Sequence, residues 1–264
     1  MEFKEIIYEK PWVVEGAARI TINRPPMNTV TTTTWRELSE AFEDAASDDS
    51  IGVIVLTGAG EKAFCIGGGF EPGQKGFPLE MKQYCEKTHS IIRDAPKPVI
   101  ASVNGLAIGG GHVLHVLCDL TIASEKARFG QAGPKVGSFD AGFGSAYLAK
   151  VVGEKKAREI WYLCKLYSAE DAISMGLVNK IVPPDKLEEE TLDWCKEILA
   201  KSPTALRFLK ASFNQFSDSL RGVERIALDA VWQFYDTEEA QEGVSAFLEK
   251  RTPDWSKWRG GSKN

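Results

Sequence analysis

Two runs of consecutive apolar residues constrain the fold most, because each has the length of a strand and each leads into a glycine-rich segment. The runs span residues 51–57 and 98–103, and glycine triplets follow them at 67–69 and 109–111. Strands without polar alternation are usually buried on both faces, as in parallel sheets covered by helices. An apolar stretch of helical length, 111–118, follows the second triplet. A unit of strand, glycine turn and helix therefore occurs twice, which predicts an α/β fold.

The segments on either side of these units extend the pattern. Residues 6–9 and 17–22 predict two strands that end in a turn at 23–26, and residues 31–46 predict a helix capped by threonine. From residue 154 onward helical spacing dominates, with one strand-like stretch at 177–182. The expected helices span 154–166, 169–175, 186–200, 203–216, 222–234 and 237–251.

Composition and charge exclude several functions. A formal net charge of -5 and a pI near 5.4 give no reason to expect binding to nucleic acid or to a membrane surface. The five cysteines form no CxxC pair and only three histidines are present, so neither a disulfide framework nor a metal site is expected. Without a signal-peptide pattern or a membrane-length apolar run, the expected location is the cytoplasm.

One glycine motif is misleading. Residues 58–63 follow a strand and fit the pattern G-x-G-x-x-A of dinucleotide-binding folds. In those folds a helix begins at once, whereas residues 64–69 continue as a glycine-rich loop. Nicotinamide binding is therefore not expected.

The two triplets have a structural and a chemical interpretation. A single triplet would be explained by a tight turn alone. Two triplets, each after a buried strand, also let backbone N–H groups approach a ligand without obstruction by side chains. A pair of converging N–H donors is what an oxyanion requires, so we predict an anion-stabilising centre at these turns.

Three motifs carry a resemblance to a known family. They are residues 62–68 (KAFCIGG), 96–111 (PKPVIASVNGLAIGGG) and 118–123 (CDLTIA). Through them the chain resembles the crotonase (enoyl-CoA hydratase/isomerase) superfamily over nearly its whole length.

The resemblance implies an acyl-CoA substrate and an α/β fold. Residues 1–195 would form a spiral of ββα repeats. Residues 196–264 would form a C-terminal helical trimerisation region that also covers the active site. The N–H groups of Gly68 and Gly110 would hold the thioester oxyanion, with no cofactor besides the CoA of the substrate. A trimer or a dimer of trimers is expected, also because Trp255 and Trp258 look costly to expose in a monomer.

Side chains decide which crotonase reaction is expected. Standard hydratases carry two glutamates at the positions of Val113 and Gly133, so the acid and base of hydration are missing here. Residues 129–144 and 234–239 resemble two other branches, 2-ketocyclohexanecarboxyl-CoA hydrolase and 1,4-dihydroxy-2-naphthoyl-CoA synthase. The hydrolase opens a β-keto ring by retro-Dieckmann cleavage, the synthase closes a ring by condensation, and both form a thioester enolate. The synthase branch can hold bicarbonate in place of a carboxylate, which leaves a bound anion near Gly133 open.

Ring-opening hydrolysis, as in the breakdown of aromatic and alicyclic acids, is the favoured function. Residues 154–168 and 241–251 are more similar to the hydrolase, Gly69 stands where the synthase usually has an acidic residue, and His89 matches a histidine of the hydrolase pattern. Ring-closing synthesis is the alternative. Hydration, isomerisation or a non-catalytic acyl-CoA-binding scaffold are further alternatives.

Four side chains are assigned catalytic roles by this resemblance. Asp140, positioned by Ser138, would be the general base on the attacking water, and Tyr235 would donate a hydrogen bond to the ring ketone. Asp140 and Ser138 could instead cap a helix near residue 142, and Tyr235 could be a packed aromatic residue. His89 would transfer a proton or orient water, with a purely structural role as the alternative.

The remaining site residues concern the substrate. Val113, Gly133 and Phe143 are expected to line the acyl pocket, and Phe143 in place of a frequent tyrosine suggests an apolar alicyclic or bicyclic acyl group. Arg24 and Lys250, the latter from a neighbouring subunit, would meet the CoA phosphates. Each of these two could equally be a solvated surface charge.

Overall fold

The computed structural model describes residues 2–69 and 77–259 and contains two β-sheets. Within these residues the larger sheet has six strands in the order β1-β2-β3-β5-β7-β10. β1 and β2 are antiparallel, and every other neighbouring pair is parallel. The strands are β1 (Ile6–Glu9), β2 (Ala17–Ile22), β3 (Val53–Gly58), β5 (Val99–Val103), β7 (Leu120–Ser124) and β10 (Lys180–Val182).

The smaller sheet brings the glycine turns together. Its order is β4-β6-β8-β9, with β4, β6 and β8 parallel and β9 antiparallel to β8. The strands are β4 (Ala63–Cys65), β6 (Leu106–Ile108), β8 (Arg128–Gly130) and β9 (Tyr167–Ser168). The sequence analysis did not predict these strands, because segments of two or three residues show no periodicity and form only by pairing with distant segments.

The helices that were expected agree with the structure to within a few residues at each end, and two further helices, α2 and α4, were not among them. They are α1 (Thr32–Ser47), α2 (Leu79–Asp94), α3 (Gly110–Leu117), α4 (Leu148–Val152), α5 (Glu154–Leu163), α6 (Ala169–Ser174), α7 (Leu187–Leu199), α8 (Pro203–Gln215), α9 (Leu220–Tyr235) and α10 (Glu238–Leu248). Short helical turns are η1 (Gly133–Lys135), η2 (Phe143–Tyr147, a π-helical turn), η3 (Pro184–Lys186) and η4 (Ser256–Trp258). The predicted threonine cap is confirmed: Thr31 Oγ1 accepts from Thr34 N–H, and Thr34 Oγ1 accepts from Thr31 N–H.

The larger sheet is buried on both faces, as its unbroken apolar runs predict. Ile54 and Leu56 of β3 face a core that includes Trp35 and Phe42 of α1. The alternate residues Val53 and Val55 face a second core that α7 completes with Leu187 and Cys195. Alternate residues of one strand thus enter two cores, which explains why no polar alternation is visible.

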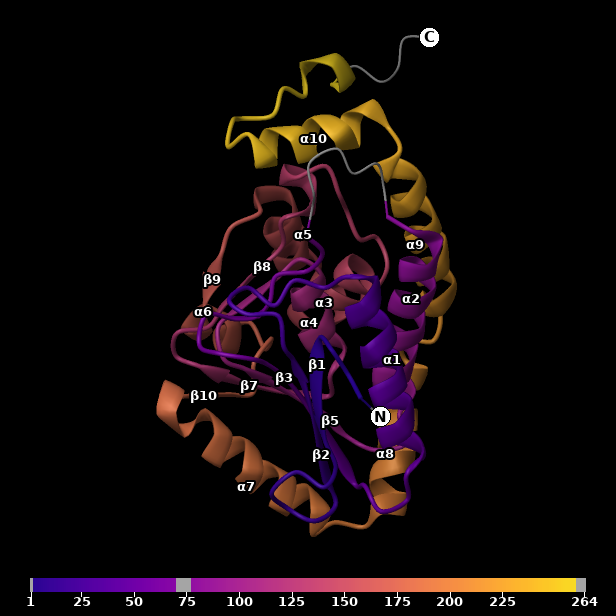
Figure 1. Ribbon diagram of the computed structural model, residues 1–264, viewed down its shortest axis with the longest axis vertical. Helices are drawn as coiled ribbons and strands as arrows, with labels where there is room; N and C mark the ends of the chain where they lie inside the picture. The colour runs from indigo at the N-terminus through magenta and orange to yellow at the C-terminus, as the bar shows by residue number, and fades with distance from the viewer. Residues whose placement is uncertain (1, 70–76, 260–264) are drawn as a thin grey trace.

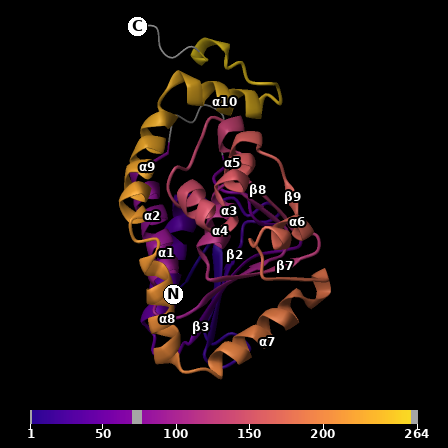
Figure 2. The ribbon, with the colours of Figure 1, turned by 180° about the vertical axis from the view of Figure 1, so that it is seen from behind.

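The C-terminal helices lie on the outside of this core (Figure 1). α8 and α9 run along the side formed by α1 and α2, α10 crosses one end, and α7 lies at the opposite end, as the reverse view also shows (Figure 2). The predicted boundary between residues 195 and 196 falls inside α7, so it does not coincide with the end of an element.

The exposed apolar surface differs from the expected one. Trp255 and Trp258 are half-buried and pack edge to face with ring centroids 6.3 Å apart. Large apolar side chains are exposed at several places, among them Val13 and Tyr162, and a group of exposed aromatic and aliphatic side chains lies on α8, on the residue that follows it and on α9. They include Phe208, Phe213, Phe216 and Ile226. In the part of the chain that the structure describes, no helix is long and apolar enough to cross a membrane.

Candidate active site

The two glycine turns lie against each other in the structure. Gly67 has a φ of +80°, and a Cβ atom on it would lie 2.7 Å from the backbone nitrogen of Gly110. A Cβ atom on Gly111 would lie 2.0 Å from the carbonyl oxygen of Cys65. Real Cβ atoms do not approach other atoms so closely, so glycine is required here by contact as well as by backbone conformation.

Two backbone donors are left free by this arrangement. Within residues 2–69 and 77–259, the N–H groups of Gly68 and Gly110 donate to no acceptor. Gly110 is also the first residue of α3, whose N-terminus carries a partial positive charge. Unpaired donors beside a helix N-terminus stabilise an anion, as an oxyanion requires.

A cavity of about 930 Å³, including its mouth, adjoins these donors. Its wall comes from both glycine turns, from α2, α3 and α9 and from the segment between β8 and η2, and it is mainly apolar. Of the predicted site residues, it is lined by Gly68, His89, Gly110, Val113, Gly133, Ser138, Asp140 and Tyr235.

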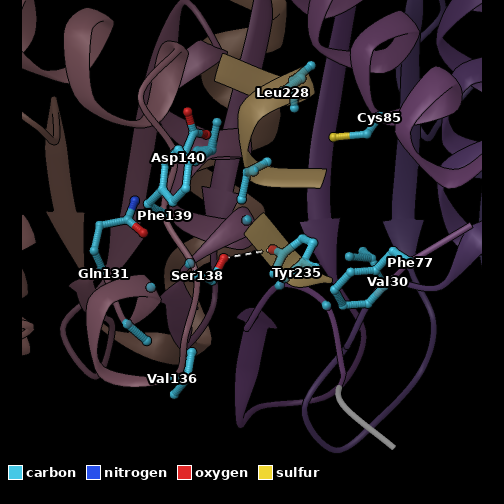
Figure 3. A pocket seen from close by; sticks show the side chains of 18 of the residues that line it. Val30, Phe77, Cys85, Gln131, Val136, Ser138, Phe139, Asp140, Leu228 and Tyr235 are labelled. Carbon is cyan, nitrogen blue, oxygen red and sulfur yellow. Dashed lines mark hydrogen bonds between the residues drawn. The ribbon is translucent and has the colours of Figure 1, made fainter. Parts of the chain in front are cut away.

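Ser138 and Tyr235 point toward one another across this cavity (Figure 3). The Ser138 Oγ and Tyr235 Oη atoms are 2.7 Å apart and form a hydrogen bond. The Tyr235 ring also packs edge to face on Phe77, with centroids 4.8 Å apart. Burial raises the pKa of Tyr235 to about 12, so the phenol is neutral and can donate at neutral pH.

Asp140 lines the same cavity but is held differently from the prediction. No hydrogen bond joins it to Ser138 among the described residues; its Oδ1 accepts from the Gly142 N–H, 2.7 Å away, at the start of η2. Asp140 therefore contacts the backbone just before η2 but does not cap this helical turn, and its catalytic role stays a prediction. Burial raises the pKa of Asp140, against the opposing effects of His89 and of the Gly142 and Gly144 N–H groups.

His89 is almost completely buried, at 4% exposed, and both ring nitrogens have partners. Its Nδ1 lies 3.3 Å from Glu224 Oε1, and its Nε2 lies 3.7 Å from Cys85 Sγ. Burial alone would lower the pKa of His89, but Cys85 and the Glu224 carboxylate outweigh it and raise the pKa well above its ordinary value.

Glu224 was not predicted from the sequence; it contacts His89 but does not itself line the cavity. It is buried on α9, and its position follows the apolar spacing of that helix, since it comes three, four and seven residues before the buried Ala227, Leu228 and Val231. A carboxylate on the apolar face of an amphipathic helix was the available signal, because such a charge needs a partner.

The acyl-pocket residues are placed as follows. Val113 is buried in the cavity wall, on α3. A Cβ atom on Gly133 would lie 2.8 Å from the Ser138 carbonyl oxygen and 3.0 Å from the Trp161 ring, so this position has no space for a side chain. Phe143 does not line the cavity, because its ring lies behind the wall and packs edge to face on His89 at 6.3 Å.

The two basic residues expected to bind CoA are not brought together within this chain. Arg24 Nη1 donates to the carbonyl oxygen and the hydroxyl of Thr29, at 2.8 and 2.9 Å, and its Nε lies 3.3 Å from Glu5 Oε1. Thr29 lies beside Gly69, so Arg24 is near the first glycine turn. Lys250 is exposed after the end of α10, at a φ of +55°, and does not line the cavity.

Two further histidines lie behind the glycine turns. His112 and His115 of α3 are buried with ring centroids 4.9 Å apart, and burial lowers the pKa of both. Both are therefore neutral packing residues. Among the described residues, no group of three or more His, Cys, Asp or Glu side chains could hold a metal ion.

Known proteins are similar to this chain in sequence and fold. The family model for enoyl-CoA hydratase/isomerase matches residues 13–258. An enoyl-CoA hydratase from Mycobacterium avium subsp. paratuberculosis K-10 has a TM-score of 0.84 at 27% identity, covering 97% of this chain and 100% of that one. An enoyl-CoA hydratase/carnithine racemase from Magnetospirillum magneticum has a TM-score of 0.76 at 32% identity, covering 96% of each chain. A monofunctional enoyl-CoA isomerase from M. smegmatis has a TM-score of 0.70 at 29% identity, covering 81% of this chain and 94% of that one.

These similarities confirm the resemblance at the level of the superfamily and the α/β crotonase fold, with its two mixed sheets and C-terminal helices. The chain belongs to the enoyl-CoA hydratase/isomerase family of the crotonase superfamily, the acyl-CoA enzymes.

Proposed function

We propose that the protein opens the ring of an alicyclic β-ketoacyl-CoA by hydrolysis. The observation that carries the proposal is the hydrogen-bonded pair Ser138 and Tyr235, 2.7 Å apart, in the cavity that the free donors of Gly68 and Gly110 adjoin. Such a pair can bind the ring ketone while the glycine donors bind the thioester oxygen. A β-ketoacyl thioester presents both oxygens at once.

The reaction follows from these positions. Asp140 takes a proton from water, whose oxygen adds to the ring ketone, and Tyr235 donates to the oxygen that becomes negative. When the bond between this carbon and the α-carbon breaks, its electron pair forms the thioester enolate, which Gly68 and Gly110 stabilise. The α-carbon takes the proton from Asp140, and the former ketone carbon becomes a carboxylic acid at the other end of the same molecule, which releases its proton to solvent. A cyclohexane substrate would give a pimeloyl-type product.

The missing carboxylates argue against enoyl-CoA hydration, although similar structures are named hydratases. Hydration needs an acid and a base on the added water. Val113 supplies neither, and at Gly133 the Ser138 backbone and Trp161 fill the space of a side chain. Isomerisation can proceed with one carboxylate, such as Asp140, and is therefore included in the test.

A panel of thioesters tests the proposal. Incubation with 2-ketocyclohexanecarboxyl-CoA or a bicyclic analogue should give a product heavier by one water, and a reaction in H₂¹⁸O should place one label in the new carboxylate. Loss of water from succinylbenzoyl-CoA would favour the synthase instead, and turnover of crotonyl-CoA or a 3-enoyl-CoA would favour hydration or isomerisation. Absence of any ring-opened product would refute the proposal.

The panel includes matched variants. Tyr235→Phe and Asp140→Asn should abolish most turnover, whereas Tyr162→Phe, which changes an exposed tyrosine of α5, should not. If Asp140→Asn leaves turnover unchanged, the assignment of the general base is wrong.

We also propose that the active form is a homo-oligomer, a trimer or a dimer of trimers. The support is the exposed apolar surface of Phe208, Phe213, Phe216 and Ile226, which is unusual for a monomer. In such an assembly Lys250 could reach a neighbouring subunit's CoA site, which Arg24 would share. Light scattering after gel filtration tests it: Phe213→Asp should lower the measured mass, and a monomeric wild type would refute it.

A further inference from the structure

A buried carboxylate of α9 has no role in the reaction as proposed. Glu224 is 5% exposed, and its Oε1 lies 3.3 Å from His89 Nδ1 of α2. Removing a carboxylate from water is costly unless it is paired, so this contact offsets part of the cost of burying Glu224. The pair therefore joins the helix that carries Tyr235 to the helix that carries His89.

Three titratable groups face His89. Cys85 comes from α2 itself, Glu224 from α9, and Asp140 from the segment before η2, whose charge interacts with that of His89. The other contacts are aromatic rings, Trp35 of α1 and Phe143 of η2. Glu224 engages Nδ1, so Nε2 is the nitrogen on the side of Cys85, which lines the cavity.

The backbone couples Glu224 to Asp140 as well. A Cβ atom on Gly142 would lie 2.9 Å from the Glu224 Cα and 3.3 Å from Asp140 Oδ1. The same Gly142 donates its N–H to Asp140 Oδ1. The segment that holds Asp140 is therefore packed directly on α9 at Glu224, the residue that His89 contacts.

We propose that Glu224 is a positioning residue, which holds His89 in its protonated form with Nε2–H toward the cavity and so keeps Asp140 a carboxylate. The inference rests on the proposed function, because it assigns the purpose of Asp140 as the base. His89 then pairs with Glu224, and its charge also lowers the pKa of Asp140, which lines the same cavity. Without Glu224, one of the two groups that raise the pKa of His89 is lost, so less positive charge on His89 is left to oppose the effect of burial on Asp140.

The electrostatics agree with this arrangement. Burial opposes a charge on His89, yet Cys85 and Glu224 raise its pKa above the ordinary value, so its charge is present at neutral pH and is lost as the pH rises through that pKa. Burial also raises the pKa of Asp140, and the charge on His89 opposes that rise. Loss of the His89 charge should therefore raise the pKa of Asp140 further.

NMR titration tests the first link without any substrate. The chain has three histidines, and burial lowers the pKa of His112 to about 3, so a signal that titrates above pH 7 identifies His89. In Glu224→Gln this titration should move to lower pH. Asp229→Asn, which removes an exposed carboxylate of the same helix that pairs with Lys82 of α2, should leave it in place. An unchanged His89 titration in Glu224→Gln overturns the proposal.

The pH dependence of ring opening tests the second link. Glu224→Gln should lower kcat/KM about tenfold at pH 6 and much less at pH 9, because a raised pKa of Asp140 affects only the acidic side of the profile. Glu224→Asp should restore much of the activity at pH 6. A loss of equal size at every pH indicates a purely structural residue and overturns the proposal. If wild-type protein opens no ring while the NMR result holds, the proposed function fails and the coupling stands.

Discussion

Replacing Gly67 by alanine, compared with a control glycine of the same φ, should show whether the contact between the two glycine turns is needed for turnover as well as for stability. At a φ of +80° any side chain costs roughly 1–2 kcal/mol of stability. The new Cβ would also lie 2.7 Å from the Gly110 nitrogen, and overpacking of this kind costs about 1–3 kcal/mol more. Relief of that contact must move the two turns apart, and hence the donors of Gly68 and Gly110. Loss of one oxyanion donor typically lowers kcat by about 10²–10³-fold.

Gly153→Ala is the matched control for this change. Gly153 has the same φ of +80°, but a Cβ atom on it would meet nothing within 4 Å. Both variants should therefore lose roughly 1–2 kcal/mol in urea denaturation, with a further loss only in Gly67→Ala. Only Gly67→Ala should lose turnover in the ring-opening assay, measured where both variants remain folded. Equal turnover by the two variants would refute the argument that the contact between the turns sets the donor geometry.

Three other predictions follow from single contacts. Lys210→Met should lower the free energy of unfolding by about 1–3 kcal/mol, measured in urea, because the buried ammonium donates to the carbonyl oxygens of Ile92 and Lys97. Burial raises the pKa of Tyr235 to about 12, so the pH profile of kcat/KM should show no loss from its ionisation below about pH 10; a loss there that Tyr235→Phe removes would contradict this. Arg24→Ala should raise KM about tenfold for a CoA thioester and leave KM unchanged for a pantetheine thioester, which lacks the nucleotide phosphates.

The glycine turns could be predicted from sequence because their requirement is local. A left-handed φ at Gly67 and a close backbone approach at Gly111 admit only glycine. The glycine pattern in the sequence therefore predicts the conformation of the turns directly. The long strands and helices were predictable for the same reason. The four short strands of the smaller sheet were not, since each exists only through pairing with a segment far away in the chain.

Contacts between residues that are far apart in the sequence could not be predicted from local patterns. Ser138 and Tyr235 were each candidates, but their hydrogen bond spans 97 positions and depends on how α9 packs on the core. A hydrogen bond of Ser138 to Asp140 is absent among the described residues, where the Gly142 N–H donates to Asp140 and the Ser138 hydroxyl pairs with Tyr235.

The burial of Glu224 could be predicted from the sequence, although the identity of its partner could not. Its spacing from Ala227, Leu228 and Val231 places a carboxylate on the buried face of α9, where a charge must be compensated. The compensating group, His89, lies 135 positions away on α2, and no local pattern connects the two. A buried glutamate at such a position has two explanations. Its desolvation cost is small enough for the fold to remain stable, or it serves to keep its partner, His89, protonated. Because Asp140 lies beside that partner in the cavity, the second explanation ties the packing of α9 to the protonation state of the proposed base.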